Sequence, residues 1–132
     1  MANKGALVIG GGISGIASAL KLSENGYQVY LVEKEPVIGG YAASFCCKAT
    51  EKCSKCSVCL LPEKLLAVAA DPQISLLVNS EVAGISGQLG DFEVDLRQKP
   101  SFVDAEKCIT CGICTELCPS EPQKAIYLSS PE

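Results

Sequence analysis

The chain has 132 residues, of which 48% are hydrophobic and 20% charged, so it has the size of one compact domain and is no disordered polyelectrolyte. Its formal net charge of −4 argues against nucleic-acid binding, because such proteins need a basic face. The absence of histidine excludes a Ser-His-Asp or Cys-His catalytic site and every His-ligated metal, Rieske or haem centre.

Nine cysteines are far more than a small intracellular core needs, so they indicate either a secreted disulfide scaffold or metal sites. The apolar stretch from Gly5 to Leu20 is the best match to a secretory signal, but its glycines form a motif of their own. That stretch is also too short to cross a membrane, and no later segment predicts a membrane span. We therefore expect a cytoplasmic protein whose reduced thiols bind metal.

The first part of the chain predicts a β-α-β unit. Residues 5–9 form an apolar run that is typical of a buried parallel strand. Residues 13–22 have a helical pattern that Asn25-Gly26 ends, and residues 27–32 predict a second strand that closes at Glu33. Residues 36–40 are expected to be a loop, and residues 46–59 are polar and rich in cysteine.

The later elements are shorter. Good helix formers follow Pro62 at residues 63–70, and residues 74–78 are another apolar strand. Residues 82–85 and 91–96 predict a hairpin or meander, and in the second strand apolar and acidic residues alternate, so one face should be wet. Pro100 marks a boundary, and residues 125–128 are a possible strand.

A glycine-rich loop joins the first strand to the first helix. It has the pattern G-x-G-x-x-G, and its residues are Gly10, Gly11, Gly12, Ile13, Ser14 and Gly15. In a dinucleotide-binding loop the first glycine allows the tight turn, the second lets a pyrophosphate approach the backbone, and the third lets helix and strand pack closely. The helix N-terminus offers N–H groups to the phosphate, and Glu33 can accept hydrogen bonds from ribose hydroxyls. The alternative is a glycine-rich turn without a ligand.

Four cysteines in the last part of the chain have the spacing of a bacterial ferredoxin. They are Cys108, Cys111, Cys114 and Cys118, and Pro119 follows directly. Such spacings wrap one turn of chain around a [4Fe–4S] cluster, and Gly112 permits close approach of the backbone. The alternative is a zinc knot, although zinc sites usually have paired C-x2-C knuckles. In two-cluster ferredoxins the fourth cysteine binds the other cluster, so the ligand role of Cys118 stays open.

Five further cysteines lie between residues 46 and 59. Cys53, Cys56 and Cys59 form a three-thiolate set, and the fourth ligand is Cys46 or Cys47. Adjacent residues of an extended chain point in opposite directions, so one of the two is expected, and Cys47 is nearer in sequence. We expect a second [4Fe–4S] cluster here, with a redox-active C-x2-C pair and a zinc site as open alternatives.

The run from Val32 to Gly40 (Val-Glu-Lys-Glu-Pro-Val-Ile-Gly-Gly) resembles the start of the two-dinucleotide-binding-domain flavoproteins. In that family the double glycine follows the ribose-binding acid and lies near FAD. The resemblance therefore favours FAD over NAD, and it adds Lys34, Gly39 and Gly40 to the expected cofactor-binding residues.

The combination of a flavin loop, a cysteine cluster and a ferredoxin run resembles the flavin and iron–sulfur subunit of heterodisulfide reductase and its relatives. The resemblance includes Cys56-Ser-Val-Cys59-Leu-Leu-Pro, the stretch from Lys99-Pro100 to Lys107-Cys108, and Lys124-Ala-Ile-Tyr127. It implies a thioredoxin-reductase-like FAD domain that carries a cluster and has a ferredoxin module inserted in it. It also places Val82 where a backbone contact to adenine is common. Family members are far longer, so the resemblance is to an N-terminal portion.

The sequence thus predicts an α/β fold in two parts. Residues 1–99 should form a partial FAD-binding Rossmann-like domain with the cysteine cluster, and residues 100–132 a ferredoxin-like iron–sulfur module. The expected function is electron transfer through FAD and one or two [4Fe–4S] clusters within an anaerobic redox complex, with no catalytic side chain assigned. Other redox subunits are expected partners, and a separate chain or missing segment should complete the flavin domain. The alternatives are a ferredoxin-like adaptor with a vestigial flavin loop and a zinc-bound structural module.

Overall fold

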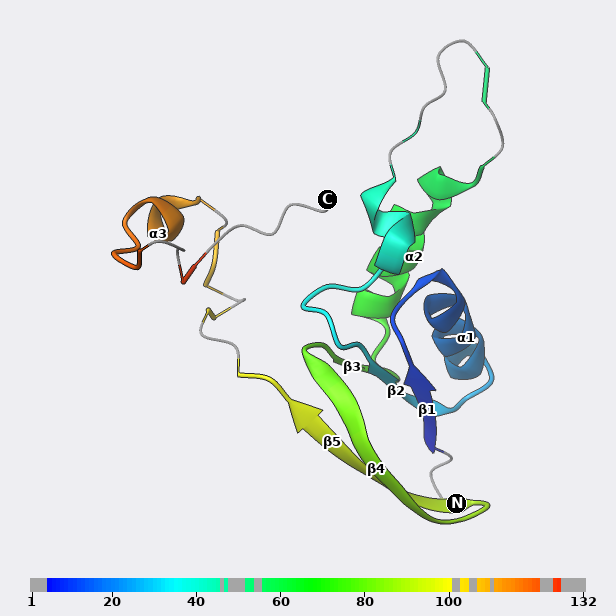
Figure 1. Cartoon of the computed structure of the whole chain (residues 1–132). Helices are drawn as coiled ribbons and strands as arrows, with labels where there is room; N and C mark the ends of the chain where they lie inside the picture. The colour runs from blue at the N-terminus through cyan, green and yellow to red at the C-terminus, as the bar shows by residue number, and fades with distance from the viewer. Residues whose placement is uncertain are drawn as a thin grey trace. The chain divides into compact units, whose positions relative to one another are not determined.

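The computed structural model describes residues 5–45, 47, 52–53, 56–100, 103–104, 107–109, 111–121 and 125–126. The chain divides into two compact units, residues 1–100 and residues 101–132 (Figure 1). In the described part, none of the helices has the length and apolar character that crossing a membrane requires.

The first unit is built on a three-stranded parallel sheet. Its strands are β1 (Gly5–Ile9), β2 (Gln28–Val32) and β3 (Ile74–Leu77), in the order β1-β2-β3. Val29 in the central strand is paired with Ala6 on one side and with Ile74 on the other. These are the three strands that the apolar runs predicted, and their arrangement confirms the α/β class.

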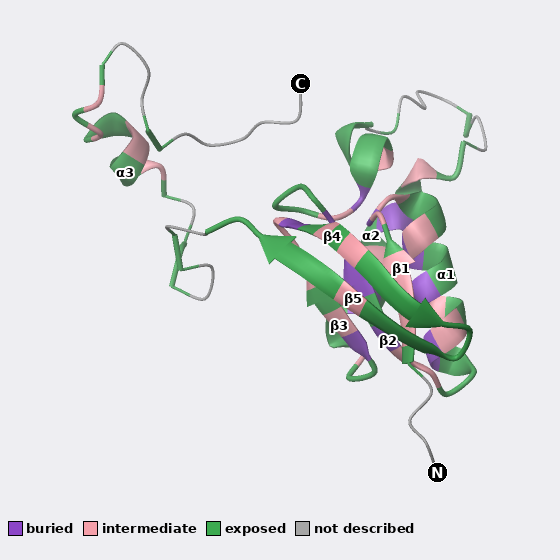
Figure 2. Ribbon diagram, turned by 60° about the horizontal axis from the view of Figure 1, so that its bottom comes forward, coloured by how far each residue is buried: buried purple, intermediate pink, exposed green. Residues whose placement is uncertain are grey.

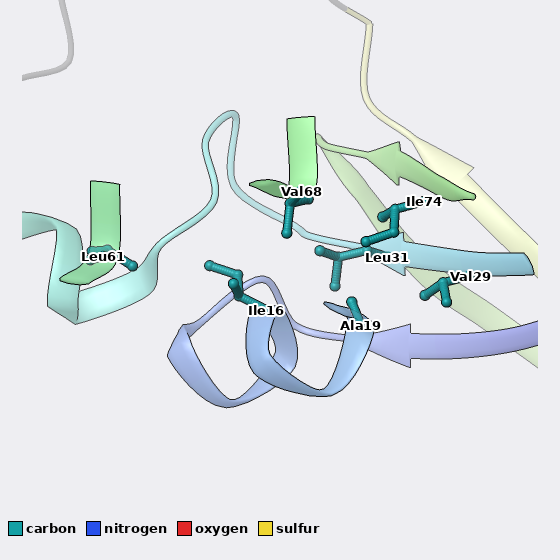
Figure 3. Close-up of a cluster of buried hydrophobic side chains, with 7 residues drawn as sticks. All are labelled: Ile16, Ala19, Val29, Leu31, Leu61, Val68 and Ile74. Atoms are coloured by element: carbon teal, nitrogen blue, oxygen red, sulfur yellow. The ribbon is translucent and has the colours of Figure 1, made fainter. Parts of the chain in front are cut away.

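Two helices cover one face of this sheet. They are α1 (Ile13–Glu24) and α2 (Leu61–Ala70), and α2 begins two residues earlier than the sequence predicted, with Pro62 in its first turn. Successive strand residues point to opposite faces, so Val29 and Leu31 face the helices and Tyr30 faces away. Figure 3 shows the resulting core, whose buried members are Ile16, Ala19, Val29, Leu31, Leu61, Val68 and Ile74.

An antiparallel hairpin lies against the other face of the sheet (Figure 2). Its strands are β4 (Ser80–Gln88) and β5 (Asp91–Gln98), each longer than predicted. A cleft of about 570 Å³ separates Leu7 and Tyr30 of the sheet from the hairpin. The apolar face of β5 is only partly covered: Phe92 is 60% exposed and Leu96 is 40% exposed. The reason is that a two-stranded hairpin over three short strands buries little surface.

Short helical turns flank the cysteines. The 3-10 helix η1 (Gly40–Ser44) precedes the first cysteine segment, η2 (Val58–Leu60) contains its last cysteine, and neither helix was predicted. The second unit contains α3 (Ile113–Glu116). Of the possible strand at 125–128, residues 125 and 126 form a bend and the other two lie outside the described residues.

Candidate functional site

The glycine loop makes the turn between β1 and α1 as expected. Gly10 has φ +98°, a conformation that favours glycine, and its N–H donates to the carbonyl oxygen of Val32 over 2.7 Å. Gly12 is the N-cap of α1 with an extended backbone, and its carbonyl oxygen accepts the first helical bond from the N–H of Ile16 at 2.9 Å. The loop therefore ends on the free N–H groups of a twelve-residue helix.

Gly15 and Gly12 lack side chains for different physical reasons. A methyl group on Gly15 would overlap with the carbonyl oxygen of Gly10, so this glycine permits the close packing of α1 on the loop. A methyl group on Gly12 would meet no atom within 4 Å. The open space beside Gly12 is therefore available to a group other than protein, at the position where the motif places a pyrophosphate.

Glu33 ties this loop to the end of β2. The residue is only 8% exposed, and its two carboxylate oxygens accept different backbone N–H groups. Oε2 accepts from the N–H of Gly11 at 2.6 Å, and Oε1 accepts from the N–H of Glu35 at 2.9 Å. Lys34 next to it is exposed, with its Nζ 3.8 Å from the carboxylate of Glu35.

The double glycine lies against the same loop. The N–H of Gly39 donates to the carbonyl oxygen of Gly11 at 2.7 Å, and Gly12 and Gly39 form a parallel bridge. Gly39 and Gly40 have φ values of +121° and +54°, so both adopt conformations that disfavour other residues. Two segments that are distant in sequence thus enclose one backbone cradle.

Two expected contacts lie near this cradle without completing it. Ile13 and Ser14 are exposed in the first turn of α1. Val82 lies in β4, two residues beyond Ser80, whose N–H donates to the carbonyl oxygen of Glu33 at 2.9 Å. The start of β4 therefore runs beside the expected ribose-binding acid.

The first cysteine segment lies between η1 and α2. Cys47, Cys53, Cys56 and Cys59 are exposed, and Cys46 lies outside the described residues. Cys47 and Cys59 line one cavity of about 310 Å³, together with apolar side chains that include Phe45 and Leu61. The structure therefore brings two of the expected ligands to the same hollow from opposite ends of the segment.

The sequence interpretation missed Ser57, which lies between Cys56 and Cys59. Its backbone is left-handed, with φ +63° and ψ +10°, in a region where residues other than glycine are uncommon. Serine itself gives no signal of this conformation. Only the position between two cysteines could have drawn attention to it.

In the second unit, Cys108, Cys111 and Cys114 are exposed and Cys118 is half-buried. Gly112 has φ +77° and caps α3, which contains Cys114. The described residues do not gather three or more cysteine or acidic side chains into a metal-binding arrangement. The structure thus gives the backbone of the two cysteine segments and not a closed ligand shell.

Two protein-family models match the chain. Residues 8–58 match an NAD(P)-binding Rossmann-like domain, and residues 102–124 match a 4Fe–4S binding domain. The first match contains the glycine loop, Glu33 and the double glycine, and the second contains all four cysteines of the ferredoxin run. The expected Rossmann-like fold and the expected [4Fe–4S] module are confirmed by these matches.

Named relatives cover nearly all of the chain. It is 40% identical to the CoB–CoM heterodisulfide reductase iron–sulfur A-subunit 1 of Methanopyrus kandleri, over 96% of this chain and 20% of that protein. It is 44% identical to the corresponding A-subunit of Methanocaldococcus jannaschii, over 96% and 20%, respectively. It is 46% identical to a heterodisulfide reductase A-subunit-like protein of Archaeoglobus profundus, over 86% and 16%.

The chain spans about a fifth of the length of these curated relatives. The Rossmann-like match precedes the iron–sulfur match along the chain. The chain belongs to the heterodisulfide reductase A-subunit family and corresponds to an N-terminal portion of it.

Proposed function

We propose that this chain transfers electrons through FAD and two [4Fe–4S] clusters as part of a larger redox complex. One observation carries the proposal: a dinucleotide cradle with an open space beside Gly12 is continuous in sequence with an exposed four-cysteine segment. The 4Fe–4S module follows in the same chain. We assign the flavin part to residues 1–99 and the ferredoxin-like part to residues 100–132.

The cradle fits the adenosine diphosphate part of FAD. The space beside Gly12 is free for a pyrophosphate, and the N-terminus of α1 supplies N–H groups and a positive dipole end. Each carboxylate oxygen of Glu33 keeps a lone pair that can accept a ribose hydroxyl, and its charge disfavours a 2′-phosphate. The assigned residues are Gly10, Gly11, Gly12, Ile13, Ser14, Gly15, Glu33, Lys34, Gly39, Gly40 and Val82.

The cysteine sets fit iron–sulfur clusters by their chemistry, since thiolates are the ligands that hold such clusters. We assign Cys108, Cys111, Cys114 and Cys118 to one cluster. The second cluster is assigned to Cys47, Cys53, Cys56 and Cys59. The cavity that Cys47 and Cys59 share supports Cys47 as the fourth ligand of this set.

Bound FAD would supply two-electron chemistry and the clusters one-electron steps, while the protein sets their separation and potentials. Three relatives are named as subunits of enzymes that reduce a CoB–CoM heterodisulfide, two of them also ferredoxin. We propose analogous partners: other redox subunits, together with a chain or segment that completes the flavin domain. The sheet supports this, because dinucleotide folds use five or six strands and the described sheet has three.

Anaerobic purification with iron, sulfide, zinc and flavin analysis tests the proposal. We expect about eight irons and eight sulfides per chain, as two cubanes require, with flavin absorption in the assembly that binds it. Iron and sulfide without flavin in the complete assembly would instead indicate a ferredoxin-like adaptor with a vestigial loop. Zinc without sulfide would indicate a structural module.

A further inference from the structure

Two of the four C-x2-C turns in this sequence share one backbone conformation. In Cys56-Ser57-Val58-Cys59 the residue after the first cysteine has φ +63° and ψ +10°. In Cys111-Gly112-Ile113-Cys114 the corresponding residue has φ +77° and ψ −9°. The two segments belong to different units, so the similarity is not imposed by a common neighbouring structure.

The hydrogen bonds that follow the left-handed residue also correspond. The carbonyl oxygen of Ser57 accepts from the N–H of Leu60 at 3.1 Å, and that of Gly112 accepts from the N–H of Thr115 at 2.9 Å. In each case the second cysteine lies within the helical turn that begins next: Cys59 in η2 and Cys114 in α3. The turn with glycine belongs to the matched 4Fe–4S domain.

Serine occupies this conformation against its own preference. A side chain in the left-handed region is strained, and glycine avoids that strain. Ser57 is one of two residues other than glycine that have positive φ among the described residues, and the other, Asn79, is of a type that tolerates it. Ser57 is exposed, so no tight packing around its side chain explains the conformation.

The left-handed residue has a geometric effect on the thiolates. It changes the direction of the chain after the first cysteine, and the second cysteine then lies in the helical turn that follows. A left-handed residue followed by a right-handed one also points successive N–H groups into one concavity, an arrangement found at iron–sulfur sites. Independently, Cys47 lines the same cavity as Cys59, so two cysteines from opposite ends of the first cysteine segment lie near one another.

We propose that Ser57 is a positioning residue for the cluster of the first cysteine segment, equivalent to Gly112 in the ferredoxin-like module. Its left-handed backbone holds the thiolates of Cys56 and Cys59 toward one cluster, and it aims backbone N–H groups at the sulfur atoms. This role rests on the proposed function, because it requires a cluster at this site.

The test uses the full-length Cys111→Ser variant as parent, so that the iron bound by the first segment can be measured alone. Ser57→Val puts a β-branched residue at the left-handed position, which should lower the population of the turn roughly tenfold relative to glycine. Ser57→Gly keeps the turn without strain. Ser18→Val is the matched control, since Ser18 is an exposed residue of α1.

After anaerobic reconstitution, iron content, loss of iron to a chelator and the midpoint potential of the cluster are measured for each variant. Ser57→Val should lose iron several-fold faster than its parent, by less than the roughly tenfold difference between valine and glycine, because serine already carries part of that strain. Ser57→Gly and Ser18→Val should retain iron as the parent does. Far-UV circular dichroism and the urea midpoint of the iron-free chains verify that the α/β unit stays folded.

Two outcomes overturn the inference and are distinguishable. If the Cys111→Ser parent binds no iron in the first segment, the second cluster of the proposed function is absent, and the role of Ser57 falls with it. If the parent binds a cluster and Ser57→Val retains it with the same chelator resistance and potential, only the role of Ser57 is wrong.

Discussion

Replacing Gly12 by valine separates flavin binding from folding more cleanly than any other change in the glycine loop. The backbone of Gly12 has φ −72° and ψ 179°, which every residue adopts, and a Cβ there would meet no atom within 4 Å. The Cβ of valine would therefore enter the space that we assign to the pyrophosphate. We expect Gly12→Val to abolish flavin binding in the assembly that binds it.

The effect of Gly12→Val on stability should be small because two contributions oppose each other. Restricting the unfolded chain at a compatible position stabilises a protein by about 0.4–1 kcal/mol. Replacing glycine at an N-cap by an apolar residue costs a similar amount, on the order of 1 kcal/mol. The free energy of unfolding of the flavin-free chain should change by less than about 1 kcal/mol.

Gly15→Ala provides the contrast. Its methyl group would overlap with the carbonyl oxygen of Gly10, so the helix and the loop have to move apart. Overpacking of this kind typically costs about 1–3 kcal/mol, a large part of the 5–15 kcal/mol that stabilises an ordinary domain. We expect Gly15→Ala to unfold at a clearly lower urea concentration. We also expect it to lose flavin, because the substitution destabilises the fold that forms the binding site.

Urea unfolding followed by circular dichroism, together with flavin analysis of the purified assembly, measures both effects. Full flavin retention in Gly12→Val would show that the loop is only a turn. A large loss of stability in Gly12→Val would show that the space beside Gly12 is needed by the protein itself.

Three further outcomes are expected. Cys111→Ser should remove about four irons per chain, as loss of one cubane requires, and unchanged iron after anaerobic reconstitution would contradict the assignment of the ferredoxin run. Glu33→Gln should destabilise even the flavin-free chain by about 1–3 kcal/mol in urea unfolding, because glutamine has an NH2 group in place of one of the two oxygens that accept the Gly11 and Glu35 N–H groups. Lys34→Gln is the exposed control, and equal stability of the two variants would refute the role of Glu33 in holding the loop. Light scattering of the anaerobically loaded chain should reveal association or a requirement for a partner, and a stable monomer with stoichiometric FAD would refute that expectation.

Most helices and strands of the first unit could be predicted from the sequence, because the patterns that indicate them are local. The apolar runs at 5–9 and 74–78 are typical of strands in a parallel sheet, and a glycine loop between a strand and a helix is typical of a dinucleotide-binding fold. Element ends were less accurate: β4 and β5 extend beyond the alternating residues that predicted them, since ladder hydrogen bonds continue regardless of side-chain type.

The sequence could not predict the hydrogen bonds between residues that are distant in sequence. The bonds from Gly39 to Gly11 and from Gly11 to Glu33 depend on how the crossover folds back, which no local pattern encodes. The left-handed Ser57 is similar, because serine disfavours this conformation and nothing in its local sequence indicates it. The shared cavity of Cys47 and Cys59 also required coordinates, although the spacing of the cysteines had indicated a common site.

A cluster bound by the first cysteine segment, as we propose, would link iron uptake to folding. The segment lies in the connection between β2 and β3, neighbouring parallel strands whose pairing must wait until that whole connection has closed. A cluster that joins Cys47 to Cys59 would act there as a cross-link, and cross-linking a loop of roughly 15 residues stabilises a fold by about 3 kcal/mol in the chain-entropy model.

The order of maturation follows from this link. A chain that has received iron closes its crossover more readily, and the closed crossover is what holds Gly39 and Glu33 against the glycine loop. We expect the metal to enter first and the nucleotide second. Oxidative destruction of this cluster would then weaken FAD binding at the glycine loop, even without direct contact between the cluster and FAD.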